Sequence, residues 1–168
     1  MTEQEQFQAI QQQLQKLDFP VSRVTKGTLG LPTDTLVAEL DEDEKQRARQ
    51  LVISFFPADD DLADSRFLQL YTVLPLELPT AALADASCLL HRINSRAPLG
   101  HFGLTDEDKI QFRYVWAISA SAPLSAGQIE DVLDMCIFTQ DLFYDLFLDL
   151  EAGRPLAEFE QIFARFTQ

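Results

Sequence analysis

The stretch GHFGLTDEDKIQFRYVWAIS, residues 100–119, carries the clearest secondary-structure pattern in this chain. Its second half alternates apolar and other residues, which is typical of a half-buried β-strand. We predict that one side of this strand consists of Ile110, Phe112, Tyr114, Trp116 and Ile118. Together with residues 100–104, and with an acidic turn at 105–108, it should form an antiparallel hairpin of strands 100–104 and 109–119.

Four further strand-like segments precede this hairpin, at residues 21–25, 35–40, 50–56 and 66–74. Most of their connections contain Gly, Pro or acidic residues and have the length of turns, which favours an antiparallel meander over βαβ units. The acidic run at residues 41–44 is predicted to be one such solvated turn.

Apolar residues recur at helical spacing in four other segments. These predict helices over residues 3–17, over 80–95 with Thr80 as N-cap, over 126–151 and over 156–166. Ser125 and Gln128 have the spacing of a capping box before the third helix. The sequence therefore predicts a single α+β domain over residues 1–168, in the order α-β-β-β-(β)-α-β-β-α-α, with an antiparallel sheet packed against helices.

The composition is apolar enough to fold and strongly acidic, with 46% hydrophobic residues and a formal charge of −14. The acid is unevenly spread, since residues 65–122 are formally neutral while 41–64 and 123–168 hold most of the excess. Such a field disfavours nucleic acid and anionic membrane surfaces as partners. Without a signal-like start or a long apolar run, the sequence predicts a cytoplasmic location.

No residue pattern reaches the requirements of a catalytic, cofactor or metal site. Cys88 and His91 lie three apart, but zinc needs three or four ligands, and both Cys88 and Cys136 are interpreted as core residues. The acidic residues 59–64 lack the Gly and Glu of an EF-hand loop, and residues 25–30 lack the spacing of a phosphate loop. We therefore expect no cofactor, no metal and no enzymatic activity.

Several short elements between residues 89 and 136 resemble the YbjN-like family, the so-called bacterial sensory transduction regulators. These are Ile93-Asn94, Gly100-His101-Phe102-Gly103-Leu104, Ile110-Gln111-Phe112-Arg113-Tyr114, and Leu124-Ser125 with Gln128-Ile129. The acidic, Phe-rich remainder also resembles small cyanobacterial proteins of unknown function near that family. The resemblance implies a type III secretion chaperone-like fold, whose known members include acidic homodimers that bind extended segments of a partner protein.

These observations predict a non-enzymatic protein-binding or chaperone-like regulator, acting as a homodimer with a protein partner. The apolar arc of the third helix is wider than one core face needs, and the alternative is that the last helix covers this arc. The candidate partner-binding residues are Arg113, Tyr114, Trp116, Phe138, Tyr144 and Leu148. The alternative function is a small-molecule sensor or enzyme with a pocket near Arg113, Tyr114 and Trp116.

Overall fold

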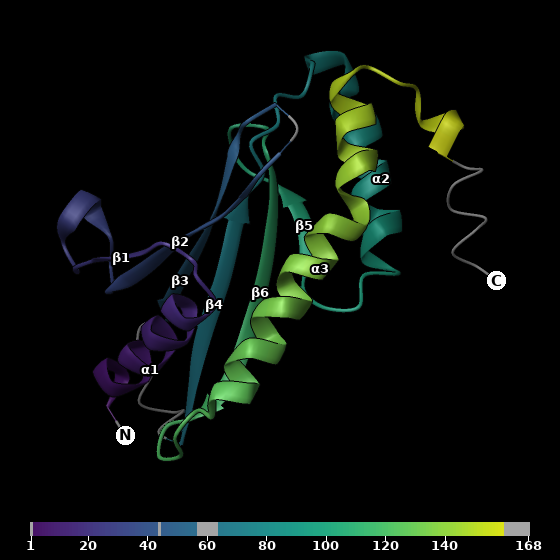
Figure 1. Cartoon of the computed structure of the whole chain (residues 1–168). Coiled ribbons are helices and arrows are strands. Elements are labelled where there is room, and N and C mark those ends of the chain that lie inside the picture. Colours follow the sequence, from purple (N-terminus) through teal and green to yellow (C-terminus); the bar gives the residue numbers. More distant parts are fainter. Residues whose placement is uncertain (1, 44, 57–63, 160–168) are drawn as a thin grey trace.

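Six antiparallel strands form the centre of the molecule, in the spatial order β1-β2-β3-β4-β6-β5 (Figure 1). This computed structural model describes residues 2–43, 45–56 and 64–159. The strands are β1 Val21–Val24, β2 Thr35–Glu42, β3 Ala48–Phe55, β4 Ser65–Val73, β5 His101–Leu104 and β6 Ile110–Ser119. The first four form the predicted meander, and the predicted hairpin pairs β5 with β6 beside β4.

The α-helices of the described residues are α1 Glu3–Lys16, α2 Leu83–Asn94 and α3 Ala126–Glu151. Figure 1 shows α1 and α3 lying across the same face of the sheet, and α2 packs beside β5 and α3. The fold class predicted from the sequence, an α+β domain with an antiparallel sheet backed by helices, is thereby confirmed.

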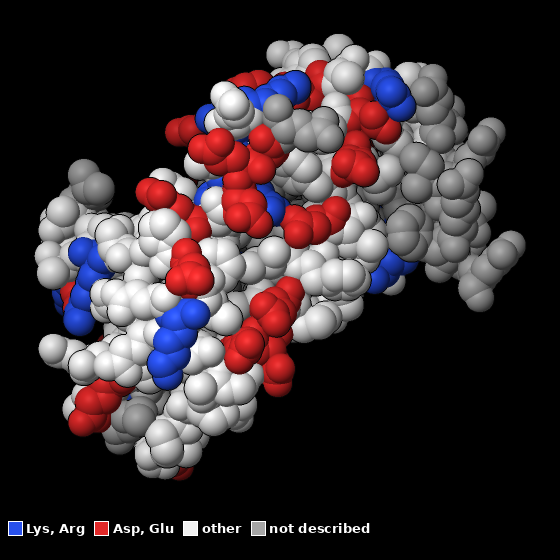
Figure 2. Space-filling model, in the orientation of Figure 1, with Lys and Arg blue, Asp and Glu red and all other residues white. Residues whose placement is uncertain are grey.

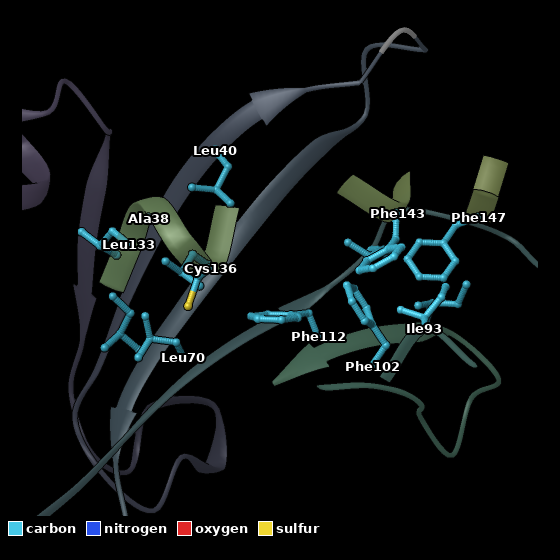
Figure 3. Close-up of a cluster of buried hydrophobic side chains, with 14 of the residues drawn as sticks. Ala38, Leu40, Leu70, Ile93, Phe102, Phe112, Leu133, Cys136, Phe143 and Phe147 are labelled. Carbon is cyan, nitrogen blue, oxygen red and sulfur yellow. The ribbon is translucent and has the colours of Figure 1, made fainter. Parts of the chain in front are cut away.

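The core fills the space between the helices and the inner face of the sheet. At its centre the ring of Phe102 lies 5.2 Å from that of Phe112, 6.0 Å from that of Phe143 and 5.1 Å from that of Phe147. Figure 3 shows how these rings, from β5, β6 and α3, converge. Burying such aromatic side chains is the main source of stability in a fold of this size.

Local features fix where α3 and β5 begin and join α2 to β5. Ser125 and Gln128 form the predicted capping box, so α3 begins at Ala126 as expected. Gly100, before β5, has a φ of 68°, and an added Cβ would lie 2.6 Å from the Phe112 ring. Asn94, the last residue of α2, donates to the Phe102 carbonyl oxygen (2.9 Å) and accepts from the Phe102 amide (2.7 Å), which joins α2 to β5.

Three sequence-based expectations are corrected. Thr80 does not cap α2, because residues 80–82 form a 3-10 turn and the helix begins at Leu83 without a side-chain cap. Cys88 is exposed, since the buried face of α2 consists of Ala86, Leu89, Leu90 and Ile93. The predicted last helix is a 3-10 turn over Leu156–Phe159, and its predicted remainder, residues 160–166, lies outside the described residues.

Candidate functional site

The face of the sheet opposite the α-helices is a broad, nearly uncharged surface, which we call the open face. Pairing aligns one residue from each strand in a row across it: Ser22, Val37, Val52, Tyr71, Arg113 and His101. Since alternate residues of a strand share a face, the open face also contains Val24, Thr35, Glu39, Gln50, Ser54, Phe56, Phe67, Gln69, Val73, Gly103, Gln111, Val115 and Ala117.

Most apolar side chains of the open face are partly exposed rather than buried. Phe56 has 38% of its surface exposed, and its ring lies 5.5 Å from the guanidinium carbon of Arg113. Arg113 Nε donates to Gln69 Oε1 at 2.7 Å, which holds the guanidinium along the sheet. Among these residues Arg113 and Glu39 are the charged ones and cancel formally, while the acidic end of β2 begins past its register shift, where Glu42 pairs with Ala48.

The structure separates the six predicted partner-binding residues into four places. Arg113 lies on the open face, whereas Tyr114 and Trp116 lie on the inner face and pack against the core. Phe138 lies on the outer side of α3 with 52% of its surface exposed. A pocket shared by Arg113, Tyr114 and Trp116 is therefore excluded by the alternation of β6, while the binding role of each residue stays a prediction.

Tyr144 and Leu148 line a cleft of about 210 Å³ between α3 and the β2–β3 hairpin. The cleft is also lined by Arg49 and by the acidic residues Glu42, Asp43, Asp141 and Asp145. Arg49, on the inner face of β3, donates to Asp141 Oδ1 at 2.6 Å, and its guanidinium carbon lies 5.5 Å from the centre of the Tyr144 ring.

The β2–β3 connection is not the solvated turn that its acidity predicts, because Asp43 points inward with only 3% of its side chain exposed. It accepts from the Arg47 backbone and Nε, from the Lys45 amide and from the Tyr144 hydroxyl at 2.9 Å. Burial raises the pKa of Asp43, but these hydrogen bonds outweigh it and lower the pKa to about 2. The pKa of the Tyr144 phenol is raised, through burial and through its bond to Asp43.

Arg47 connects this hairpin to the end of α3, since its Nη1 donates to Glu151 Oε1 at 2.6 Å. Glu151 also accepts from Lys45 Nζ (2.8 Å) and from the Glu77 amide (2.9 Å). Burial would raise the pKa of Glu151, yet these donors lower it to about 2. We call the group Asp43, Arg47, Tyr144 and Glu151 the hairpin clasp.

The two cysteines lie in different surroundings. Cys136 is buried, and burial raises the pKa of its thiol to about 12, which makes it an inert core residue as predicted. Within the described ranges no three His, Cys, Asp or Glu side chains are placed to hold a metal ion. The same ranges contain no helix with the length and apolarity required to span a bilayer.

The fold and these surfaces define an α+β protein with a broad open sheet face and an acidic helix side. A family model named YbjN, with the description "Putative bacterial sensory transduction regulator", matches residues 52–149, more than half of the chain. The chain therefore belongs to the YbjN family, which confirms the resemblance found in the sequence. The description is that of a regulator, in line with the expectation of a regulatory rather than an enzymatic role.

Among solved structures, the chain is similar to one described as "Crystal structure of YbjN, a putative transcription regulator from E. coli". The two share 9% sequence identity with a TM-score of 0.44, over 81% of this chain and 86% of the other. None of the curated proteins matches the chain.

Proposed function

We propose that this chain is a protein-binding regulator that works as a homodimer, joined through the open face. The observation that carries the proposal is the row of register-aligned residues across six strands, with partly exposed Val37, Val52 and Tyr71 at its centre. Contiguous apolar surface of this kind commonly marks an interface. The family's description as a regulator supports the functional part of the proposal.

The size of the open face is sufficient for a dimer. Its four central strands contain eight residues or more each. With strands about 4.8 Å apart and about 3.4 Å per residue, they cover roughly 500 Å² in projection. The edge strands and the relief of the side chains add to this, so that the area approaches the ~800 Å² per partner of a standard interface.

Charge favours a second copy of this chain as the occupant of the open face. The chain carries −14 in total, and Figure 2 shows acidic side chains widespread over the helix-bearing side. Two copies that met through those acidic surfaces would repel each other, whereas the centres of two open faces carry few charges and repel each other less. A dimer joined in this way leaves the edge strand β1 accessible, and an extended segment of a regulated protein could add to this edge, whereas Asn94 of α2 already bonds the Phe102 backbone at the β5 edge.

Sedimentation equilibrium of the full chain tests the dimer. We expect a monomer–dimer equilibrium for the wild type, and a dissociation constant raised roughly a hundredfold or more by Val52→Lys, because a charge would be buried without a partner. Phe138→Lys is the matched control, since it adds the same charge at an exposed apolar residue of α3. Far-UV circular dichroism confirms that both variants fold.

A wild-type chain that remains a monomer at high micromolar concentration would contradict the proposal. A dimer that dissociates with Phe138→Lys but persists with Val52→Lys would place the interface on α3 instead. The proposal that the open face is the dimer interface is supported only if Val52→Lys dissociates the dimer and Phe138→Lys leaves it intact.

A further inference from the structure

A cleft of about 620 Å³ lies beside the first turn of α1 and shares only Phe56 with the surfaces described above, among its described lining residues. We call it the α1 cleft. Its size is in the range of small-molecule sites. Its described lining consists of Thr2, Glu3, Gln4, Phe7, Arg23, Lys26, Pro32, Thr33, Asp34, Phe56 and Arg66.

The charge of the α1 cleft is opposite to that of the whole chain. Among its described lining residues, Arg23, Lys26 and Arg66 exceed the two carboxylates of Glu3 and Asp34. The cleft is therefore net positive in a chain of −14, although the chain has only 13 basic residues. The positive end of the α1 helix dipole also lies here, although Glu3 and Glu5 of the first turn offset it. Such a local reversal of sign attracts anions.

The basic side chains are held in place by other groups. Arg23 forms an ion pair with Asp34 through its Nη2, and its guanidinium carbon lies 5.8 Å from the centre of the Phe7 ring. Asp34 also accepts from the Lys26 amide at 2.8 Å, so that it fixes the backbone from which Lys26 projects. Arg23 Nε is itself buried and has no hydrogen-bond partner in the described part of the chain.

Arg66 is positioned by a buried amide. Its Nη1 donates to Gln6 Oε1 at 2.7 Å, and Gln6 Nε2 donates to the Ser119 carbonyl oxygen at 3.1 Å. Gln6 is fully buried, so water does not compete with Arg66 for the Gln6 side-chain oxygen. A pre-positioned guanidinium loses little side-chain entropy when it binds an anionic oxygen.

The uncharged part of the lining is partly apolar, from Phe7, Pro32 and the partly exposed ring of Phe56, and partly polar, from Thr2, Gln4 and Thr33. A lining that combines cations with aromatic rings fits a ligand that has both an anionic group and a flat apolar body. We infer that the α1 cleft binds a small organic anion, an aromatic or similarly flat body with a phosphate or carboxylate group, contacted by Lys26 and Arg66. This site shares Phe56 with the open face, its other lining residues lie outside the proposed dimer interface, and it lies elsewhere than the pocket expected near Tyr114 and Trp116.

Titration of the ¹⁵N-labelled full chain with phenyl phosphate, followed by two-dimensional NMR, tests this inference. We expect saturable amide shifts confined to the cleft, at Thr2, Gln4, Lys26 and Thr33, with a millimolar dissociation constant that rises with salt. Benzyl alcohol, the neutral counterpart, should not produce these shifts. Either no saturable shift with phenyl phosphate or equal shifts with benzyl alcohol would overturn the inference.

Three substitutions sharpen the test. Lys26→Ala should weaken phenyl phosphate binding roughly tenfold, because a charge-assisted hydrogen bond is lost. Lys16→Ala, an equally exposed lysine at the other end of α1, should change it less than about twofold. Glu3→Gln should tighten binding, since it removes a carboxylate from the lining. If Lys26→Ala and Lys16→Ala had the same effect, a general charge effect would replace the proposed site.

Discussion

The hairpin clasp yields a quantitative prediction, because the Asp43 carboxylate is almost completely buried among hydrogen-bond donors. Asp43→Asn keeps the shape of the side chain and removes its charge. The pKa of Asp43 is lowered from 3.8 to about 2 in the folded chain. At about 1.4 kcal/mol per pKa unit, the charged form contributes roughly 2 kcal/mol to the free energy of unfolding at neutral pH. Asp43→Asn should therefore cost about that amount.

The sign of the pH dependence follows from the lowered pKa. The folded chain holds the Asp43 proton less tightly than the unfolded chain, so this contribution is fully present above about pH 5. It is lost as the pH falls from about 4 towards 2, where Asp43 becomes protonated in the folded state as well. The difference between wild type and Asp43→Asn should shrink over the same window.

Urea unfolding followed by circular dichroism, at several pH values between 7 and 2.5, measures this difference. Asp41→Asn is the matched control, because Asp41 is an exposed carboxylate two residues away in the same hairpin. We expect Asp41→Asn to change the free energy of unfolding by less than about 0.5 kcal/mol at every pH. An Asp43→Asn effect as small as this control, or one that does not decline in acid, would refute the reasoning.

Three other predictions concern the backbone, the α2–β5 junction and the thiols. Gly100→Ala should lower the free energy of unfolding in urea by more than about 2 kcal/mol, because the new Cβ would meet the Phe112 ring and the Arg113 carbonyl oxygen. Gly27→Ala is the control, since Gly27 also has a positive φ, of 85°, but nothing lies within 4 Å of an added Cβ, and it should cost only about 1 kcal/mol. Equal costs would contradict the steric argument. Asn94→Ala should cost about 2 kcal/mol by the same assay, since a partly buried backbone N–H and C=O both lose a partner, and a cost under about 0.5 kcal/mol would count against it. Ellman's reagent should modify the exposed Cys88 in the native chain and the buried Cys136 only after unfolding, and two fast thiols in the native chain would disprove this assignment.

Local patterns predicted most secondary structure of this protein, because the signals lie within a few residues of one another. The helix at 126–151 was predicted with its observed ends, since Ser125 and Gln128 close a capping box and Gly153 follows the last turn. Alternation predicted which residues of β6 face the core, and Ile110, Phe112 and Ile118 are buried there. The prediction that Cys88 is a core residue is wrong because successive residues of a helix point in directions about 100° apart. The apolar pattern of a short helix therefore defines its buried face only to within one residue.

The candidate sites depended on contacts that no local pattern contains. Asp43 was expected in a solvated turn, yet Tyr144, which binds it, lies 101 residues away in the chain. The α1 cleft assembles residues of α1, β1, the β1–β2 connection and β4. Its basic character is not visible in the sequence, since Arg66 lies far along the chain from Arg23 and Lys26 and the chain as a whole is acidic.

The amino-acid sequence by itself determined the strands, the helices and the alternation that separates Arg113 from Tyr114 and Trp116, because helix and strand periodicity is a property of adjacent residues. Only the tertiary structure decided which sheet face the helices cover and which the open face leaves exposed. It also decided that an acidic turn becomes a buried clasp, because burial and pairing depend on groups brought together from distant parts of the chain.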